Sequence, residues 1–366
     1  MPDFLGDDLT TLRDRVATLA QGPLAALRDD ATLAPADLAA RVRALSKAAG
    51  LFGLTQDPAT PALVLLVTRE TLARHHASHL PGLFGPDAGL LAGVAEPLHS
   101  THLLPLLAGD KRSGFAFTES ADAPRPSWAA VDGEHLVITG QKSYVTGGAD
   151  ADFLVALVEV DGQGPAMVVI DTALPGVTIS RHFSSLDGSH HAAFRFDGVR
   201  VPRHHAIGAP GAGRSQALAK ISAVRRAVAA DAVGTAAWAV DFVGAELLRE
   251  RRGGPRAASE RMRLRYGAMR VQAYAARATV YRTARLHDSG QDAVNESIAA
   301  KVFATEVAGQ LVDMAVQLVG GEALVTGHPL EAALRRLRAL RLAEGETDVL
   351  QVNLARGHLD LGKGRL

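Results

Sequence analysis

Few groups of side chains in this 366-residue chain have the types and spacing that chemistry requires. His75, His76 and His79 could meet on one face of a helix and bind a metal ion. No nearby carboxylate completes a ligand set, so we interpret them as a solvated helix face and predict no metal site. The chain contains no cysteine, which excludes disulfides, thiolate metal sites and a cysteine nucleophile. It also lacks the Gly-x-Ser-x-Gly elbow of many hydrolases.

One carboxylate near the C-terminus, that of Glu344, has two interpretations. In an apolar, ligand-filled cleft a carboxylate is desolvated, which raises its pKa and suits it to remove a weakly acidic proton. Alternatively, Glu344 only begins the first turn of a terminal helix, where acidic residues are favoured. The residues alone leave both interpretations open.

The glycine-rich segment Gly208-x-x-Gly211-x-Gly213 does not join a strand to a helix within a βαβ unit. We therefore interpret it as a linker between domains and not as a dinucleotide-binding loop. Lys+Arg and Asp+Glu both number 39, so no basic excess favours nucleic acid as a partner. We predict no signal peptide, no membrane span and a soluble, cytoplasmic protein, because no apolar run approaches the roughly 20 residues that a bilayer requires.

The elements that must position these residues change character twice along the chain. Up to about residue 108 the spacing of apolar residues predicts helices, including Asp37–Leu45 and Leu63–His76. From about 109 to 210, short β-rich runs alternate with turn signals such as Asp132-Gly133, which predicts an antiparallel barrel or sandwich. The predicted strands are Gly114–Thr118, His135–Thr139, Phe153–Val160, Ala166–Ile170 and Ala193–Phe196.

Beyond residue 213 the helical pattern returns. Long alanine-rich segments without internal proline predict a bundle of helices. These segments are Ser222–Leu248, Ala257–His287, Val294–Val319 and a final helix from about Glu346 to Arg356.

Five motifs, in order along the chain, resemble those of the acyl-CoA dehydrogenase family. They cover roughly residue 90 onward. They are Gly114-Phe-Ala-Phe-Thr-Glu119; Ile138-Thr-Gly-Gln-Lys-Ser-Tyr-Val-Thr146; Phe196-Asp-Gly-Val-Arg-Val-Pro202 with Ile207-Gly208; Arg225-Arg-Ala-Val-Ala-Ala-Asp-Ala-Val-Gly234; and Gln317-Leu-Val-Gly-Gly321 with Pro329-Leu-Glu331, Arg335 and Glu344-Gly345.

The resemblance implies an α+β fold of three domains. These are an N-terminal helical domain (1–108), a middle antiparallel β-barrel domain (109–213) and a C-terminal four-helix bundle (214–366). It also implies an FAD-dependent acyl-CoA dehydrogenase that converts an acyl thioester to the 2,3-enoyl product. Glu344 would be the catalytic base and flavin N5 the hydride acceptor, since no protein side chain accepts hydride.

The remaining site residues follow from the same resemblance. Those expected to bind FAD are Phe115, Phe117, Thr118, Tyr144, Thr146, Arg251, Gln317, Gly320 and Gly321, the last three through the FAD of a neighbouring subunit. Arg225 and Gly345 are expected to bind substrate. The expected partners are acyl-CoA or an acyl-carrier thioester, an electron-transfer flavoprotein, and further copies of the chain in a dimer or tetramer.

Two segments depart from the family pattern. Ser120–Pro126 replaces a Gly-Ser-Asp loop that contacts flavin phosphate and acyl-CoA, and Arg249–Gly254 lacks the phenylalanine of a segment that reaches a partner's FAD. These departures leave two alternatives open. The chain could be a non-catalytic paralogue acting as partner subunit in a mixed oligomer, or a flavin oxidase or monooxygenase on the same fold, against which the presence of Glu344 counts.

Overall fold

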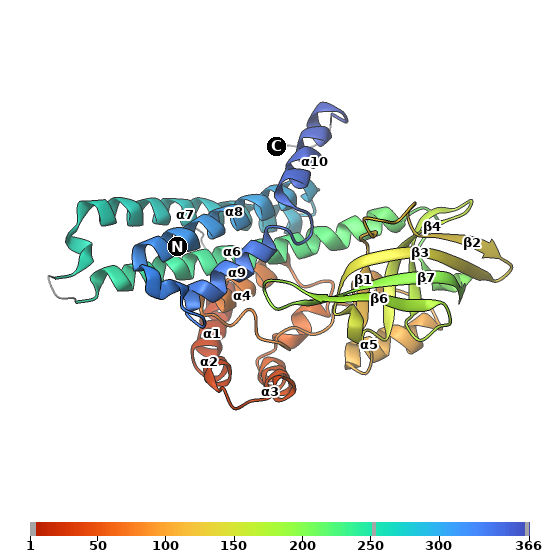
Figure 1. Cartoon of the computed structure of the whole chain (residues 1–366), viewed down its shortest axis with the longest axis horizontal. Coiled ribbons are helices and arrows are strands. Elements are labelled where there is room, and N and C mark those ends of the chain that lie inside the picture. Colours follow the sequence, from red (N-terminus) through yellow and green to blue (C-terminus); the bar gives the residue numbers. More distant parts are fainter. Residues whose placement is uncertain (1–4, 251–253, 363–365) are drawn as a thin grey trace. The chain divides into compact units, whose positions relative to one another are not determined.

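The computed structural model describes residues 5–250, 254–362 and 366 (Figure 1). Contacts divide the chain into two compact units. Unit 1 comprises Met1–Leu54, Ala59–Phe84 and Ser222–Leu366, and unit 2 comprises Thr55–Pro58 and Gly85–Ile221. The units interleave along the chain, whereas the predicted domains (1–108, 109–213 and 214–366) follow it in order. Those boundaries stay a prediction.

Unit 1 is helical. Its helices are α1 (Asp7–Gln21), α2 (Pro23–Asp29), α3 (Pro35–Ala48), α4 (Ala62–Arg74), α6 (Gly213–Leu248, of which the part from Ser222 belongs here), α7 (Glu260–Asp288), α8 (Val294–Val319), α9 (Pro329–Leu340) and α10 (Thr347–Leu359). The C-terminal helices predicted from the spacing of apolar residues are therefore confirmed, and α9 is an addition to them.

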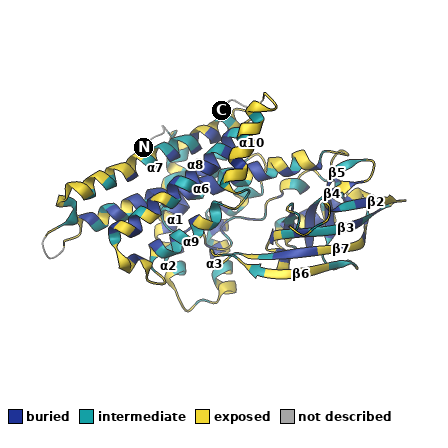
Figure 2. Ribbon diagram, turned by 45° about the horizontal axis from the view of Figure 1, so that its top comes forward, coloured by how far each residue is buried: buried dark blue, intermediate teal, exposed yellow. Residues whose placement is uncertain are grey.

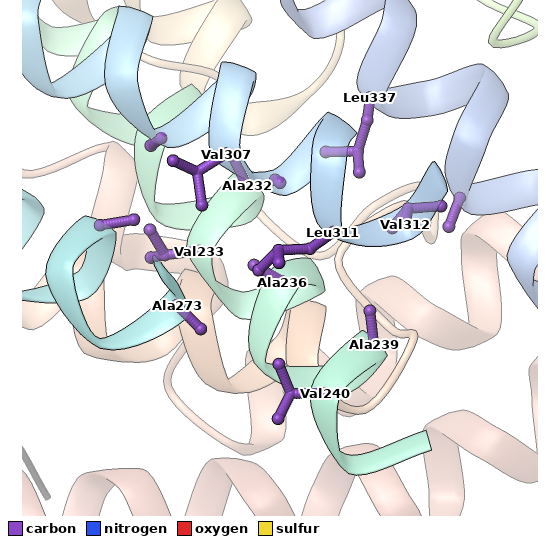
Figure 3. Packing of buried hydrophobic residues seen from close by; sticks show 14 of the residues in the cluster. Ala232, Val233, Ala236, Ala239, Val240, Ala273, Val307, Leu311, Val312 and Leu337 are labelled. Carbon is purple, nitrogen blue, oxygen red and sulfur yellow. The ribbon is translucent and has the colours of Figure 1, made fainter. Parts of the chain in front are cut away.

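The main core of unit 1 is built largely from small side chains. Alanines of α6, including Ala232, Ala236 and Ala239, pack among Val307 and Leu311 of α8 (Figure 3). The same cluster takes in residues of α4, α7 and α9. The small alanine side chain lets neighbouring helices approach closely, and it has no rotamer entropy to lose on burial. An alanine-rich sequence therefore suits this close packing of long helices.

A buried charged group joins α4 to α7. Glu70 is 5% exposed, and both Arg277 Nε and the Tyr281 hydroxyl donate hydrogen bonds to its carboxylate. Burial and the neighbouring Glu70 raise the pKa of Tyr281. Since a buried carboxylate needs a cationic partner, replacing Arg277 by a neutral residue would leave an unpaired charge in the core.

Unit 2 contains one mixed eight-stranded sheet. Its strands are β1 (Ser113–Ala116), β2 (Trp128–Asp132), β3 (His135–Thr146), β4 (Phe153–Val160), β5 (Gly164–Asp171), β6 (Val177–Ser184), β7 (His190–Pro202) and β8 (Ala206–Ile207). The order is β6-β7-β3-β2-β4-β5-β8, and β1 also pairs with β4. The expectation of a wholly antiparallel sheet is wrong in one respect, because β1 and β2 each run parallel to β4.

Strand β4 is buried on both faces, which explains its continuous apolar run. Leu154, Ala156 and Val158 belong to one core cluster, while Phe153 and Val155 belong to the other. The second cluster also contains Leu91, Leu98, Leu103 and Leu106, which come from the segment before the sheet, including the π-helix His99–Leu103 and α5 (Leu104–Ala108).

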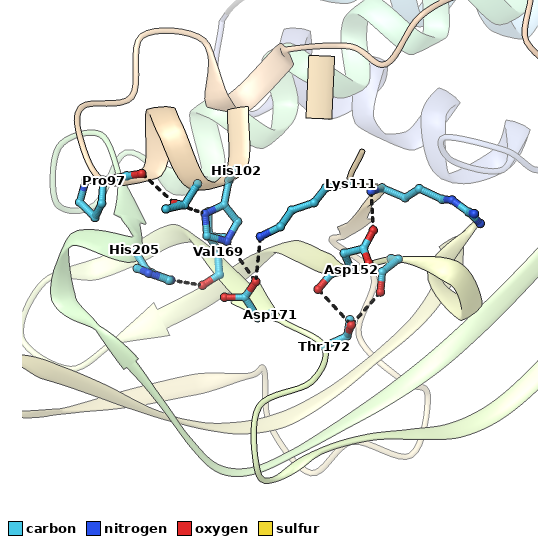
Figure 4. A network of polar contacts seen from close by, with 11 residues as sticks. Pro97, His102, Lys111, Asp152, Val169, Asp171, Thr172 and His205 are labelled. Atoms are coloured by element: carbon cyan, nitrogen blue, oxygen red, sulfur yellow. Dashed lines mark hydrogen bonds and ion pairs between the residues drawn. The ribbon is translucent and has the colours of Figure 1, made fainter. Parts of the chain in front are cut away.

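A polar network ties this segment to β5 (Figure 4). His102 Nε2 lies 3.1 Å from Asp171 Oδ1, and this hydrogen bond is the main cause that lowers the pKa of Asp171. His102 Nδ1 lies 2.8 Å from the Thr101 hydroxyl, and His205 Nδ1 lies 3.0 Å from the Val169 carbonyl. Thr101, His102 and Asp171 therefore form a hydrogen-bonded chain. Because the Thr101 hydroxyl donates to the Pro97 carbonyl, this chain stabilises the fold and does not provide an activated nucleophile.

Among the described helices, α6 and α8 are long and apolar enough to cross a membrane by length and composition. Their most apolar stretches are 61% and 50% buried within the protein, and Figure 2 shows both helices largely in the colour of buried residues. Both supply the centre of the unit 1 core, and a core helix passes the same test.

We expect Gly234→Ala to destabilise unit 1. A Cβ on Gly234 of α6 would lie 2.3 Å from the Glu70 carbonyl oxygen of α4, and neither backbone can yield locally. Overpacking of this kind costs roughly 1–3 kcal/mol. The measurement is the free energy of unfolding in urea.

The matched control is Gly309→Ala on α8, whose added Cβ meets only Arg341 Cδ at 3.8 Å, an ordinary van der Waals contact. It should be neutral or stabilise by up to about 1 kcal/mol, because alanine has the higher helix propensity. Equal effects of the two substitutions would contradict the close approach of α4 and α6.

Candidate active site

Three described residues other than glycine have a positive φ: His76 (+57°), Tyr144 (+54°) and Glu344 (+55°). The left-handed region costs an L-residue about 1–2 kcal/mol, so its surroundings must hold it there. Such residues cluster at functional sites. Two of the three, Tyr144 and Glu344, are residues that the sequence predicts to bind flavin and to act as the base.

Tyr144 lies at a β-bulge. The pairing of β3 with β7 shifts register between Lys142 and Val145, and a bulge re-aims the side chains beside it. The Tyr144 side chain meets Phe183 and His191 edge-on, with ring centroids 5.0 Å and 6.2 Å away. Because Tyr144 remains 64% exposed, much of its aromatic surface is left uncovered by the rest of unit 2.

Two exposed threonines flank this tyrosine. The Thr118 carbonyl accepts a hydrogen bond of 2.9 Å from the backbone N–H of Ser143, which places Thr118 next to the bulge. Thr146, two residues beyond Tyr144 on β3, has its hydroxyl 3.1 Å from His191 Nδ1. Hydroxyl donors beside an uncovered ring fit a flat ligand with a polar edge, such as the flavin ring.

The two phenylalanines lie deeper. The rings of Phe115 and Phe117 stack at 5.9 Å with an interplanar angle of 14°, and both pack against the cluster under β4 and β5. Lys220 Nζ lies 5.8 Å from the Phe115 ring centroid. Phe115 is half-buried and lines a separate small hollow with Val155 and Lys220, whereas Phe117 reaches the hollow beside Thr118.

This hollow has a volume of about 320 Å³. It lies beside β4, between the residues of β4 that pair with β1 and those that pair with β2. The connecting residues 117–127 cross the gap. Phe117, Thr118, Glu119, Pro126 and Ser127 of this segment line the hollow together with Leu157, Glu159 and Arg214. The altered Ser120–Pro126 loop thus follows one lining residue, Glu119, and ends at another, Pro126.

A buried lysine fixes the shape of this connection. Lys142 is 0% exposed, and its Nζ lies 2.5 Å from Glu119 Oε1. Glu119 in turn accepts hydrogen bonds from the backbone N–H and the hydroxyl of Ser127. Burial lowers the pKa of Lys142, while Glu119 opposes that shift. Both residues lie within the family-like motifs, but the sequence analysis assigned them no role.

Glu344 lies in a short turn, residues 341–345, that links α9 to α10; we refer to it as the Glu344 turn. Arg225 of α6, which is 8% exposed, donates from Nε to the Glu344 carbonyl at 3.0 Å. Burial lowers the pKa of Arg225, and Glu344 opposes that shift. Gly345 has φ +107°, and a Cβ there would lie 2.9 Å from Leu350. Both residues predicted to bind substrate therefore help to shape the Glu344 turn.

A second buried lysine contacts the same turn. Lys301 of α8 is 0% exposed, and its Nζ donates to the carbonyls of Arg341 at 2.9 Å and Gly345 at 2.8 Å. Burial and Arg225 lower the pKa of Lys301 to about 8, while Glu344 opposes that shift. Sequence patterns do not reveal this role of Lys301, because its partners lie about forty positions further along the chain.

Gln317, Gly320 and Gly321 lie exposed at the C-terminal end of α8, where Gly320 ends the helix with φ +101°. Arg256 binds this end through a 2.5 Å hydrogen bond from Nη1 to the Leu318 carbonyl. The remaining predicted flavin-binding residue, Arg251, lies outside the described residues.

The three histidines do not share a helix face, so that interpretation is wrong. Helix α4 ends at Arg74, and His76 leaves it with a left-handed backbone. Its ring packs edge-on against Trp238 at 3.9 Å, and burial lowers the pKa of His76 to about 3. Within residues 5–250 and 254–362, no group of three or more His, Asp or Glu side chains could hold a metal ion.

Comparisons with known proteins point to one family of enzymes that act on CoA thioesters. Residues 211–359 match the family model described as acyl-CoA dehydrogenase, C-terminal domain. Acryloyl-CoA reductase (NADH) of Anaerotignum propionicum is 30% identical over 288 residues, which cover 75% of this chain and 73% of that protein. The caffeyl-CoA reductase-Etf complex subunit CarC of Acetobacterium woodii is 27% identical over 274 residues, covering 72% of each.

Among solved structures, butyryl-CoA dehydrogenase from Megasphaera elsdenii superposes with a TM-score of 0.80. The match covers 98% of this chain and 100% of that one, with 21% sequence identity. It confirms the predicted α+β fold, with a helical N-terminal region, a central sheet and C-terminal helices.

Because Lys301 is buried, we expect the free energy of unfolding to depend on pH above neutrality. The pKa of Lys301 is about 8 in the folded chain against a reference of 10.5. Between these values the unfolded chain holds a proton that the folded chain has lost, so the free energy of unfolding rises with pH. The rise from this group is up to about 3 kcal/mol.

The measurement is urea unfolding between pH 7.5 and pH 10.5 of the parent and of Lys301→Met, which should lack this rise. Lys47→Met, at an exposed lysine, is the control and should follow the parent. If Lys301→Met also follows the parent, Lys301 is not buried in the folded protein.

Proposed function

This chain belongs to the acyl-CoA dehydrogenase family of oxidoreductases, and we propose that it interconverts an acyl thioester and its 2,3-enoyl counterpart with Glu344 as the base. The reaction requires removal of a proton from carbon α, which is weakly acidic, and of a hydride from carbon β. The protein itself can supply the base but no hydride acceptor.

The observation that carries this proposal is the backbone of Glu344. A left-handed glutamate is unfavourable, yet Arg225, Lys301 and the neighbouring Gly345 hold it in that conformation. The same contacts bring two buried cations, Arg225 and Lys301, to the Glu344 turn, and Glu344 opposes the lowering of their pKa by burial. The ionised form of a carboxylate is the one that accepts a proton, and in general a nearby cation favours that form.

The cofactor we propose is FAD, which when bound would supply the acceptor for the hydride. Thr118 and Thr146 would hydrogen-bond the flavin ring, and the exposed face of Tyr144 would cover it. Gln317, Gly320 and Gly321 would approach the adenine half of FAD held mainly by a second copy, with Arg251 in the same role. Exposed glycines suit such an approach, because they let a ligand come close to the backbone.

The substrate we propose is acyl-CoA or an acyl-carrier thioester. The hollow beside Thr118 is lined by both polar and apolar side chains, with the cation Arg214 among them. The Ser120–Pro126 loop, of which Pro126 lines this hollow, lacks the family's Gly-Ser-Asp sequence, so the phosphate-bearing part of the substrate would meet different groups here.

The direction of the reaction and its electron partner form a further part of the proposal. Two of the similar proteins are named as reductases, one of them as a subunit of a complex with an Etf. Proton and hydride transfer are the same bond changes in both directions. We therefore propose an electron-transfer flavoprotein as partner, with the available electron donor or acceptor setting the direction.

The first test is the visible absorption spectrum of the purified protein before and after anaerobic addition of acyl-CoAs of different chain lengths. We expect a yellow protein whose flavin absorbance bleaches. Glu344→Gln should bleach about a thousandfold more slowly, since a positioned general base contributes roughly 10²–10⁴ in rate. The control is Glu346→Gln, an exposed carboxylate two residues away, which should behave as the parent.

Three other outcomes of this test would contradict the proposal. Equal bleaching of the parent and Glu344→Gln would show that another group is the base. A colourless protein that takes up no added FAD would favour the non-catalytic paralogue. Rapid reoxidation of the reduced flavin by oxygen would favour an oxidase or monooxygenase.

We also propose that the chain forms a homo-oligomer. Helix α7 exposes Leu264, Val271 and Tyr274 by 75%, 68% and 60%. Their spacing places them on one face of the helix, where a second copy would bury them. A partner covering this face would also bring further chains close enough to share cofactor contacts.

Val271→Lys should weaken this association, because it places a charge in the centre of the apolar face. Light scattering across a concentration series measures the effect, and we expect a lower mass than for the parent. Arg270→Gln, which changes an exposed polar residue beside it, should leave the mass unchanged. A parent protein of monomeric mass at all concentrations would contradict the proposal.

A further inference from the structure

Two side chains of α8, Lys301 and Glu306, contact the Glu344 turn and the residues that flank Glu344. We infer that they are positioning residues, which hold the Glu344 carboxylate in place for proton transfer. This inference rests on the proposed function, since it assigns a task to residues that act through Glu344.

Lys301 binds the two ends of the turn. Its ammonium group donates to the carbonyl of Arg341, the first residue of the turn, and to that of Gly345, the last. The distances are 2.9 Å and 2.8 Å. Because one group holds both carbonyls, the ends of the turn cannot separate without leaving a buried cation unpaired.

Glu306 binds side chains before and after Glu344. Its carboxylate forms a two-point ion pair with Arg341, at 2.8 Å to Nε and 2.6 Å to Nη2. The same carboxylate accepts a 2.9 Å hydrogen bond from the hydroxyl of Thr347, the first residue of α10. Two-point pairs fix direction as well as distance, so Glu306 sets the orientation of Arg341 relative to α8.

The turn needs such support. Helix α9 ends at Leu340 and α10 begins at Thr347, so Glu344 lies outside both helices. Its left-handed backbone is unfavourable by about 1–2 kcal/mol in isolation. A catalytic group must stay within roughly 0.5 Å of its productive position, and a displacement of about 1 Å can cost a hundredfold in rate.

A variant that loses a positioning residue differs from one that loses a general structural residue in which kinetic quantity falls. Loss of Lys301 or Glu306 should release the Glu344 turn while the rest of α8 remains packed. The limiting rate of flavin reduction should then fall, whereas the affinity for the thioester should stay the same. Amide exchange in the turn should rise whether or not substrate is present.

The experiment compares Lys301→Met and Glu306→Gln with the control Thr305→Val. Thr305 is also buried on α8, but its hydroxyl donates to the carbonyls of Lys301 and Val302 in its own helix. Stopped-flow flavin reduction over a range of acyl-CoA concentrations gives the limiting rate and the apparent Kd. Hydrogen–deuterium exchange of the free protein follows the peptide that spans residues 341–350.

We expect the two variants to lose about tenfold or more in limiting rate, with a Kd within about twofold of the parent. Their 341–350 peptide should exchange faster than that of the parent, and Thr305→Val should match the parent in all three quantities. If Lys301→Met does not fold, Glu306→Gln decides alone, because its side chain is partly exposed.

Unchanged rates and unchanged exchange in the folded variants would overturn the inference. A fall in rate caused only by a weaker Kd would overturn it as well. Glu344→Gln separates this failure from that of the proposed function: if it reduces flavin at the parent rate, both fail. If it is slow while the α8 variants match the parent, only the positioning role fails.

Discussion

The burial of one positive charge organises the C-terminal part of unit 1. Lys301 lies in the N-terminal half of α8 and its side chain is fully buried, so its ammonium needs oxygen atoms that no other donor occupies. Carbonyls inside a helix are already bonded, whereas those of a broken helix are free. The break between α9 and α10 supplies them at Arg341 and Gly345. The ammonium therefore binds both sides of the break, and the left-handed Glu344 lies between the two carbonyls.

Unit 2 also contains a buried lysine whose charge is paired with oxygen atoms from a neighbouring connection. Lys142 is also fully buried, and Glu119 bends back from the end of β1 to reach it. The chain contains only six lysines among its 39 basic residues, and two of them are these buried groups. An arginine could not replace them easily, because its planar, forked head is larger and does not match a single compact set of oxygens.

Patterns within a segment predicted the fold well. Phe153–Val160 is predicted with the bounds of β4, because it is an apolar run between turn signals. Val294–Val319 is predicted with the bounds of α8, because its apolar residues have helical spacing and no proline interrupts it. The strand predicted to reach Thr118 ends at Ala116, since the residues beyond it turn towards Lys142. The parallel pairing of β1 and β2 with β4 depends on contacts between segments, which spacing along the chain does not reveal.

For the site, the resemblance named Tyr144 and Glu344, but it could not predict their left-handed backbones. Those depend on a register shift against β7 and on the contacts of α8 with a distant turn. Lys301 and Glu306 went unnoticed for the same reason. Conversely, the spacing of His75, His76 and His79 suggested a shared helix face only because the end of α4 at Arg74 leaves no clear mark in the sequence.

The pairing of β1 and β2 with one edge of β4 has a consequence for how this protein can change over time. Ser113–Ala116 and Trp128–Ala129 are both anchored to β4, at 153–156 and 159–160. The residues between them start and finish on the same strand, but Thr118 bonds Ser143 and Glu119 bonds the buried Lys142. Insertions, deletions or replacements confined to Ser120–Pro126 therefore leave the hydrogen-bonded ladder untouched. Natural variation and laboratory grafting can both exploit this freedom, because a new lining for the hollow can be introduced while the sheet that supports it stays the same.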